Sequence, residues 1–157
     1  MNIIAALTQN YVIGNEGKLP WPRLKGDLPI FKQKTAGKTV VMGRLTYESM
    51  GSKPLPNREN IVVSRTMPET QGIIVVRSLE DAIAAATREV WFIGGERIFT
   101  EALIFARELH LSWVKQEYEG DAYFPRFEEQ EWTKAKITEY EEFTLTEYTR
   151  RPRGGRD

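Results

Sequence analysis

The sequence has no cysteine and only one histidine, His110, among its 157 residues. Without thiols the chain can form no disulfide, no thiolate metal site and no cysteine nucleophile, which suits a reducing cytoplasm. A single histidine also excludes a site built from several imidazole ligands. We therefore expect neither a bound metal nor covalent catalysis by sulfur.

Excess charge and long apolar runs are absent as well. Lys plus Arg and Asp plus Glu number 22 each, so no global field favours nucleic acid or an anionic membrane as a partner. No run approaches the roughly 20 apolar residues of a membrane span, and the N-terminus lacks the basic and apolar regions of a secretion signal. We expect a soluble cytoplasmic protein that captures any charged ligand locally.

The order of elements predicts one α/β domain over residues 1–150. Strands are expected at 2–7, 38–43, 60–64, 73–76, 90–95 and 108–118, and helices at 27–35, 44–51, 78–89 and 96–106. Their alternation predicts a central, mostly parallel eight-stranded sheet with helices on both faces. Segments 132–140 and 143–151, rich in Thr and aromatics, predict a C-terminal antiparallel hairpin. Residues 151–157 are expected to form a disordered tail.

One isolated carboxylate, Asp27, stands at the start of the helix expected at 27–35. The chain contains no G-x-G-x-x-G, Walker A, H-E-x-x-H or G-x-S-x-G motif that would suggest another centre. Asp27 could simply cap the helix. Alternatively, it lies in an apolar pocket beside Leu28, Ile30 and Phe31, where an unpaired charge is costly. A ligand with adjacent N–H donors would then be its partner.

Arginine follows or ends a strand at three places in the predicted sheet: Gly43-Arg44, Ser64-Arg65 and Arg77-Ser78. Backbone N–H groups at a helix N-terminus together with guanidinium groups bind anions, and such sheets bind ligands beyond the carboxyl ends of their strands. These segments suit a ligand with several phosphates. Gly94-Gly95 is explained either by a tight turn or by the close approach of a flat cofactor to the backbone.

Seven segments, in this order, resemble a bacterial dihydrofolate reductase over nearly the whole chain: IIAAL, VIGNEGKLPW, DLPIFK, VVMGRLTYESMG, PLPNRENIVVS, WFIGGERIF and EGDAYFP. The resemblance implies the fold of that family and NADPH as cofactor. It implies reduction of 7,8-dihydrofolate to 5,6,7,8-tetrahydrofolate by hydride transfer, in support of one-carbon and thymidylate metabolism. A monomer that binds antifolates is expected with it.

On the substrate side, the resemblance implies that Asp27 is the active-site carboxylate, with Trp21 and Ser112 completing the catalytic group. Ser112 stands where the family usually has a threonine whose hydroxyl bonds to the carboxylate. Arg58 matches the arginine that holds the α-carboxylate of the glutamate tail in bidentate fashion. The implied substrate-binding residues are Ile4, Ala5, Asp27, Leu28, Phe31, Lys32, Met50, Lys53, Leu55, Arg58, Ile93 and Ser112.

On the cofactor side, the resemblance implies that Arg44 and Arg65 hold a 2'-phosphate, which favours NADPH over NADH. The loop 11–23 resembles a mobile lid over the nicotinamide, supported by Gly120 and Asp121, and the family's Gly-Gly peptide bond is cis. The implied cofactor-binding residues are Ala6, Ile13, Gly14, Asn15, Gly17, Lys18, Leu19, Gly43, Arg44, Leu45, Thr46, Ser49, Ser64, Arg65, Arg77, Gly94, Gly95, Glu96, Arg97, Ile98 and Phe99.

Some positions depart from the family pattern, and two other functions stay open. Ile30, Glu96 and Phe99 replace residues common in the family, and segment 22–26 is one residue longer than in some bacterial members. The first rival is the related reductase of riboflavin synthesis, which shares the fold and NADPH. The second is a catalytically inert folate or nucleotide binding protein. Asp27 followed by Phe31, together with PLPNR, favours folate.

Overall fold

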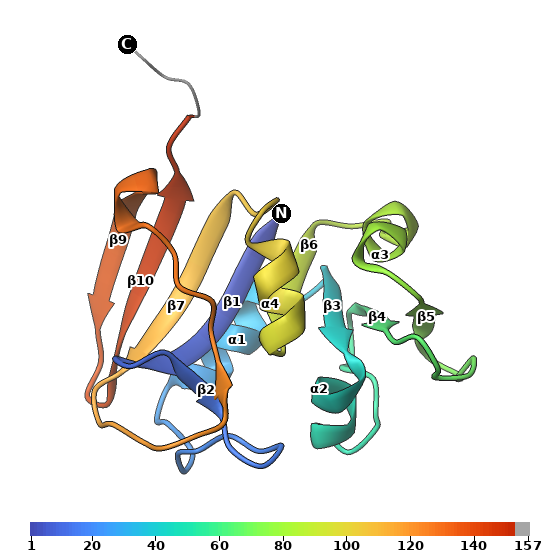
Figure 1. Ribbon diagram of the computed structural model, residues 1–157, viewed down its shortest axis with the longest axis horizontal. Coiled ribbons are helices and arrows are strands. Elements are labelled where there is room, and N and C mark those ends of the chain that lie inside the picture. The colour runs from blue at the N-terminus through green and yellow to red at the C-terminus, as the bar shows by residue number, and fades with distance from the viewer. Residues whose placement is uncertain (153–157) are drawn as a thin grey trace.

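An eight-stranded sheet forms the centre of the molecule in the computed structural model, which describes residues 1–152 (Figure 1). Its strands are β1 (Asn2–Thr8), β3 (Thr39–Gly43), β4 (Glu59–Val63), β5 (Ile74–Val76), β6 (Val90–Gly94), β7 (Glu108–Val114), β9 (Trp132–Glu139) and β10 (Phe143–Arg150). They lie in the order β5-β4-β3-β6-β1-β7-β10-β9. Pairings from β5 to β7 are parallel, and β10 is antiparallel to both β7 and β9. The predicted mostly parallel sheet with a C-terminal hairpin is confirmed.

Helices cover both faces of this sheet, as predicted. They are α1 (Asp27–Thr35), α2 (Arg44–Ser49), α3 (Leu79–Ala85) and α4 (Glu96–Ala102), with a short 3₁₀ turn, η1 (Glu129–Glu131). Side chains of α3 and α4 share one apolar cluster with β1 and β7. Tyr47 of α2 and Phe31 of α1 belong to a second cluster. Figure 1 shows α4 in front of the sheet and α1 behind it.

The alternation of side chains along β1 and β7 decides which groups face α1. Ile3 and Leu7 join the cluster beneath α3 and α4, whereas Ile4 joins the cluster on the other face. In β7, Leu111 belongs to the first cluster, so Ser112, the next residue, faces the opposite side. Its register partner in β1 is Ala6. The pleat therefore turns a buried hydroxyl toward α1.

Three helices end earlier than the sequence predicts. They stop at Ser49, Ala85 and Ala102, compared with expected ends at 51, 89 and 106. For α3 the reason is visible, because the Glu59 carboxylate accepts hydrogen bonds from the N–H and hydroxyl of Thr87, each at 2.9 Å, and so holds the chain extended. The predicted start is confirmed, since the Asp81 N–H donates to Ser78 Oγ at 3.0 Å.

A small two-stranded sheet that the sequence analysis missed joins the predicted lid to residues 122–123. Its strands are β2 (Val12–Gly14) and β8 (Ala122–Tyr123), both too short to show alternation. Asp121 accepts from the Glu16 N–H at 3.2 Å, so the expected support of the lid by residues 120–121 is present. A Cβ on Gly120 would lie 2.3 Å from the Gly14 carbonyl oxygen, so only glycine fits this contact.

The C-terminal boundary of the folded region differs by one residue from the prediction. Arg151, assigned to the tail, donates its N–H to the Glu131 carbonyl at 2.8 Å and its Nε–H to the Trp132 carbonyl at 3.4 Å. Of the predicted tail, residues 153–157 lie outside the described residues. No helix within residues 1–152 is long and apolar enough to cross a membrane.

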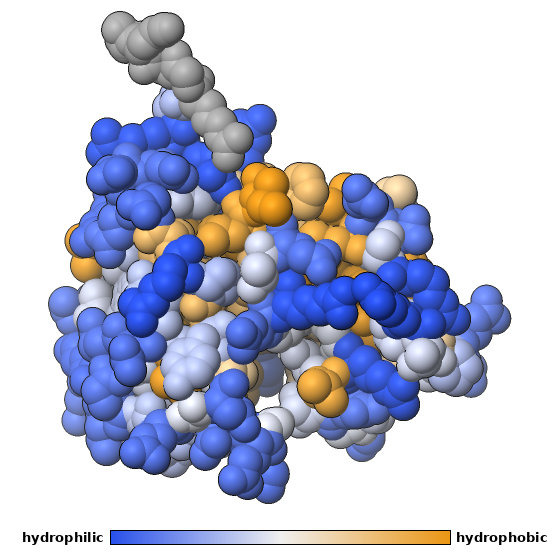
Figure 2. All heavy atoms as spheres, viewed as in Figure 1, coloured by the Kyte–Doolittle hydropathy of each residue, from blue (hydrophilic) through white to orange (hydrophobic). Residues whose placement is uncertain are grey.

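Polar side chains cover most of the face shown in Figure 2, with one apolar area near the start of β1 and the end of α4. Ile104 and Phe105, which follow α4 in the chain, are 68% and 42% exposed.

His110 is buried on the α1 side of β7, among charged groups. Its Nε2 lies 2.9 Å from Glu108 Oε1, and its Nδ1 lies 3.6 Å from Glu147 Oε1, the same oxygen that pairs with Lys34. Trp91 stacks obliquely on the ring, with centroids 4.7 Å apart. Burial lowers the pKa of His110, and Lys34 acts in the same direction, while Glu108 and Glu147 oppose both. The folded protein therefore favours the neutral imidazole.

This environment predicts a loss of stability in mild acid. The pKa of His110 is lower in the folded than in the unfolded chain, so protonation favours unfolding as pH falls below about 6.5. Above that pH the side chain is neutral in both states, and the effect vanishes. Urea titrations at pH 7.5 and 5.5 should show a smaller loss of unfolding free energy for His110→Gln than for the wild type. Equal losses would contradict this assignment.

Candidate active site

Asp27 is the first residue of α1 and does not cap it. The N-cap is Gly26, which has a left-handed conformation with φ 93° and makes no side-chain hydrogen bond to the helix. That conformation favours glycine, because other side chains clash there. The capping interpretation of Asp27 is therefore wrong, and its carboxylate instead accepts a hydrogen bond from the Ser112 hydroxyl, with Oγ 3.0 Å from Oδ1.

The Asp27 carboxylate is half-buried, and no ion pair within residues 1–152 reaches it. Burial raises the pKa of Asp27, whereas the hydrogen bond from Ser112 acts in the opposite direction by favouring the charged form. A partly desolvated carboxylate with one hydroxyl partner retains several lone pairs. A ligand that brings neighbouring N–H groups can satisfy them.

Five of the predicted apolar wall residues come together beside this carboxylate's helix. Phe31 of α1 packs against the same cluster as Ile4 of β1, and the remaining members pack around them. The five are Ile4, Phe31, Met50, Leu55 and Ile93. Ala5 packs against the cluster on the opposite face, so its backbone rather than its methyl group would border a ligand.

The other predicted substrate residues are more scattered. Leu28 is 40% exposed, and Lys32 and Lys53 are exposed as well. Trp21 is buried in a third cluster with Leu24 and residues of β7 and β10, and its ring meets Tyr118 edge-on at 6.0 Å. Trp21 makes no direct hydrogen bond to Asp27 in the described structure.

Arg58 lies at the far end of α1 from Asp27. Its Nε donates to the Pro56 carbonyl at 2.9 Å, and its Nη1 donates to Thr35 Oγ1 at 3.1 Å. Its Cζ is 5.9 Å from the centre of the Phe31 ring, and partial burial lowers the pKa of Arg58. Helix α1 thus runs between an anionic group at one end and a cationic group at the other.

Sequence reasoning missed Thr35, the buried partner of Arg58. Thr35 closes the predicted helix 27–35, and nothing in the sequence indicates a contact between it and residue 58. A hydroxyl in the last turn of an otherwise apolar helix face was the one available signal.

The carboxyl ends of β3 and β6 meet where the cofactor was expected. Gly94 and Gly95 are joined by a cis peptide bond, as the family resemblance implied. A Cβ on either glycine would lie only 3.3 or 3.4 Å from the Thr46 hydroxyl oxygen. Side chains at these positions would fill the space, so the glycines keep two backbone segments and one hydroxyl available to a flat ligand. This cradle fits the predicted cofactor.

Two of the three predicted arginines converge at the neighbouring strand ends. Arg44 pairs with Glu48 at 2.8 Å and reaches Thr66 Oγ1 at 3.4 Å, and Arg77 donates to the Ser64 carbonyl at 2.9 Å. The Ser64 hydroxyl accepts from the N–H groups of Thr66 and Met67, which shapes the turn that carries the exposed Arg65. A phosphate at this turn could draw Arg44 away from Glu48.

The lid residues form a tight turn. Asn15 and Lys18 exchange backbone hydrogen bonds at 2.8 and 3.0 Å, with Gly17 at φ 80° between them. Ile13 packs against the core cluster that includes α4, and Ala6 against the cluster that includes Trp21. Leu19, at the other end of the turn, is 66% exposed. Gly14 belongs to β2.

Predicted residues of α2 and α4 differ in where their side chains point. The Glu96 carboxylate accepts from the Tyr123 N–H at 3.0 Å, and Arg97 pairs with Glu101, so neither side chain meets the Thr46 hydroxyl. Ile98 and Phe99 are buried. In α2, Leu45 is 77% exposed and the Ser49 hydroxyl donates to the Thr46 carbonyl.

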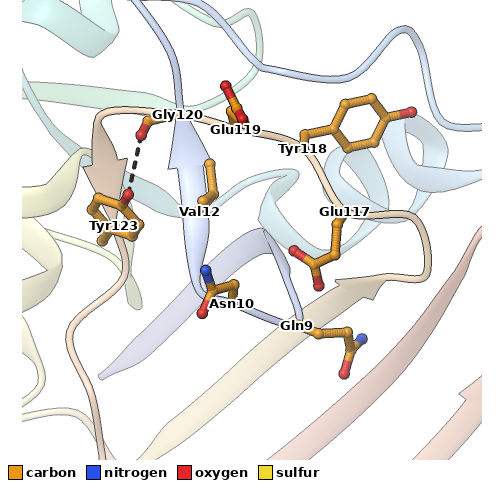
Figure 3. A pocket seen from close by; sticks show the side chains of 8 residues that line it. All are labelled: Gln9, Asn10, Val12, Glu117, Tyr118, Glu119, Gly120 and Tyr123. Carbon is orange, nitrogen blue, oxygen red and sulfur yellow. Dashed lines mark hydrogen bonds between the residues drawn. The ribbon is translucent and has the colours of Figure 1, made fainter.

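A cavity of about 700 Å³ lies elsewhere, between residues 9–12 and the segment before β8 (Figure 3). It is lined by Gln9, Asn10, Val12, Glu117, Tyr118, Glu119, Gly120 and Tyr123. None of these is among the predicted catalytic, substrate-binding or cofactor-binding residues, although Val12 belongs to the predicted lid and Gly120 to its predicted support. Two carboxylates, those of Glu117 and Glu119, would repel a phosphate or a carboxylate. Residues 1–152 contain no group of three or more side chains suited to a metal.

The chain is similar to known proteins over most of its length. The sequence matches the family described as "Dihydrofolate reductase" over residues 1–151. It is 45% identical to the dihydrofolate reductase of Buchnera aphidicola subsp. Acyrthosiphon pisum over 129 residues, covering 81% of this chain and 80% of the relative. Identity to the Bacillus subtilis dihydrofolate reductase is 42% over 135 residues, covering 84% and 79%.

A solved structure is similar in fold as well as in sequence. It is described as dihydrofolate reductase from Enterococcus faecalis complexed with NADP(H) and RAB-propyl. Its TM-score is 0.85 at 34% sequence identity, and the match covers 96% of each chain.

The Ser112 hydroxyl should hold down the pKa of Asp27. Ser112→Ala removes a donor that favours the charged carboxylate, so the titration midpoint of Asp27 should move to higher pH. Carbon-13 NMR of the Asp27 carboxyl, assigned with Asp27→Asn, measures this directly. Ser112→Thr keeps the hydroxyl and serves as the matched control. A midpoint unchanged in Ser112→Ala would show that the hydrogen bond does not affect the carboxylate.

Proposed function

The chain belongs to the dihydrofolate reductase family, and on that premise we propose how its residues divide the work of the reaction. The protein is an NADPH-dependent oxidoreductase that reduces 7,8-dihydrofolate to 5,6,7,8-tetrahydrofolate. The proposal concerns which side chains bind the pterin, the glutamate tail and the cofactor. Its main support is the half-buried Asp27 carboxylate, whose only side-chain hydrogen-bond partner among residues 1–152 is the Ser112 hydroxyl.

Asp27 binds the pterin through its 2-amino and N3 positions. Two neighbouring N–H groups match the geometry of one carboxylate, and the partly desolvated site strengthens that interaction. Asp27 favours the protonated pterin electrostatically, while water delivers the proton. Ser112 keeps the carboxylate oriented. Trp21 contributes by packing where the lid meets α1.

Arg58 binds the α-carboxylate of the glutamate tail, with Lys32 and Lys53 as exposed helpers. Phe31 and the walls formed by Ile4, Leu55 and Ile93 enclose the rings between Asp27 and Arg58. A planar guanidinium is suited to bidentate recognition of a carboxylate. The spacing of these two groups along α1 selects a substrate with N–H donors at one end and an acid at the other.

The glycine cradle and the neighbouring arginines hold NADPH, which supplies the hydride when bound. Gly94 and Gly95 admit its flat ring against the backbone, and Thr46 offers a hydroxyl between them. Arg44, Arg65 and Arg77 hold the phosphates at the ends of β3, β4 and β5. The turn at 15–18 and Leu19 close over this site and exclude water.

We further propose a cytoplasmic monomer without nucleic-acid or membrane partners. It would bind antifolates that place an amino-substituted ring against Asp27, since such rings offer the same pair of N–H donors as the pterin. Its product would serve one-carbon and thymidylate metabolism.

Removing the Asp27 charge should abolish most of the activity without unfolding the protein. Asp27→Asn is expected to lower hydride transfer at pH 7 by about 100-fold or more, since the pterin loses its anionic partner. Single-turnover oxidation of NADPH, followed by absorbance, measures this. Thermal unfolding provides the control, because loss of a partly buried charge should not destabilise the fold. An unchanged rate would exclude Asp27 from the reaction.

Removing Arg58 should affect substrate capture rather than the chemical step. Arg58→Leu is expected to raise the KM for dihydrofolate by about 10- to 100-fold, since charged hydrogen bonds are each worth about 1.5–3 kcal/mol, and to leave kcat nearly unchanged. The NADPH KM is the internal control. If the cofactor KM rose in its place, the assignment of Arg58 to the tail would be wrong.

The same assay separates the two rival functions. Preference for a deaminated ribosylaminopyrimidine over dihydrofolate would favour the riboflavin-type reductase. Tight NADPH binding without dihydrofolate-dependent oxidation would favour an inert binding protein.

A further inference from the structure

Arg58 is held by two acceptors that do not belong to any ligand. One is the carbonyl of Pro56 on its own loop, which accepts from Nε at 2.9 Å. The other is the hydroxyl of Thr35 at the end of α1, which accepts from Nη1 at 3.1 Å. The first contact lies two residues away in sequence, whereas the second ties the guanidinium to a different element of the fold.

Thr35 is well suited to fix a side chain in place. It is fully buried, with 0% of its surface exposed, and its hydroxyl donates to the Phe31 carbonyl at 2.7 Å. Because a hydroxyl has a single hydrogen, that bond leaves only lone pairs for Arg58. Thr35 Oγ1 can therefore act only as an acceptor toward the guanidinium.

The loop that carries Arg58 is also fastened to its surroundings. Asn60 is buried, and its side-chain amide accepts from the Leu55 N–H at 2.9 Å and donates to the carbonyls of Leu55 and Arg58. The Asn57 carbonyl accepts from the Gly37 N–H at 2.8 Å, just beyond α1. The backbone at Arg58 is therefore fixed relative to Thr35, so their contact does not depend on a flexible loop.

These bonds determine which part of the guanidinium is left for a carboxylate. A guanidinium has five N–H donors, and Nε and one hydrogen of Nη1 are engaged. A bidentate contact through Nε and Nη2 is excluded, since Nε has only one hydrogen. The remaining pair, Nη1 and Nη2, forms the end of the group and can still donate hydrogen bonds to two carboxylate oxygens.

We propose that Thr35 is a positioning residue for substrate binding, which turns the Nη1–Nη2 end of Arg58 toward the α-carboxylate of dihydrofolate. This inference rests on the proposed assignment of Arg58 to that carboxylate. Thr35 does not touch the substrate. It removes rotational freedom from a long side chain before binding, and so lowers the entropy that binding would otherwise cost.

The test uses Thr35→Val, which replaces the hydroxyl by a methyl group of similar size at a buried position. The KM for dihydrofolate should rise by about tenfold, which is the effect of one weakened charged hydrogen bond, and kcat should not change. The KM for 6-methyl-7,8-dihydropterin, which has no glutamate tail, should stay at the wild-type value. A rise for both substrates would indicate a general packing defect and overturn the proposal.

Two further variants separate position from packing. Thr35→Ser keeps the hydroxyl and should restore most of the wild-type KM, whereas Thr35→Ala should behave as Thr35→Val does. Thr35→Ala also keeps the test available if valine prevents folding, which thermal unfolding will reveal. A serine variant as impaired as the valine variant would contradict the role of the hydroxyl.

The double variant Thr35→Val with Arg58→Leu tells this inference apart from the assignment of Arg58. If Thr35 acts only through Arg58, the double variant should have the dihydrofolate KM of Arg58→Leu alone. If Arg58→Leu leaves that KM unchanged, the assignment of Arg58 to the tail fails. If Arg58→Leu raises it and Thr35→Val does not, the assignment stands and the positioning role of Thr35 is overturned.

Discussion

A carboxylate that the fold buries in part without pairing it to a cation is the constraint on which this structure depends. Asp27 is held by one hydroxyl, that of Ser112, and by its place as the first residue of α1. Burying such a group works against folding, so the fold retains it at a cost that the substrate's N–H donors can offset. The left-handed glycine before it, the pleat of β7 and the apolar walls all serve to present that one group.

Among the described residues, a second partly buried charge without an ionic partner, of opposite sign, lies at the other end of α1. Asp27 begins the helix, and Arg58 lies against its last residue, Thr35. The guanidinium is half-buried and held by neutral oxygens, so its charge also has no carboxylate partner within residues 1–152. A molecule that spans the helix can satisfy both ends.

Much of the fold could be predicted because its signals are local. Buried strands such as 90–94 are apolar runs bounded by turn residues, and Ser78 with Asp81 marks a helix start. The ends of helices were harder to predict, because α3 stops just before Thr87, which binds the carboxylate of Glu59, a residue distant in sequence. The β2–β8 sheet escaped prediction because segments of three and two residues show no periodicity.

In the candidate site, too, residues with a local sequence signal could be predicted, whereas contacts between distant segments could not. Asp27 stands out in sequence because it is a lone charge among apolar residues, and Gly43 and the Gly94-Gly95 pair mark strand ends. The contact between Thr35 and Arg58 links positions 23 residues apart in the chain, and no spacing rule predicts it. Predicted residues such as Glu96 and Arg97 lie near the site in sequence, but their side chains bond to Tyr123 and Glu101 instead.

The position of β1 in the sheet also governs the order in which the chain can fold. This first strand forms no hydrogen-bonded pair with β2, β3, β4 or β5, the strands that follow it in the chain. Its partners are β6 and β7, which end at Gly94 and Val114. During synthesis on the ribosome, the apolar strand β1 therefore stays without its pairing partners until most of the chain has been made. Such long-range pairing slows folding and leaves an apolar segment exposed until its partners have been made.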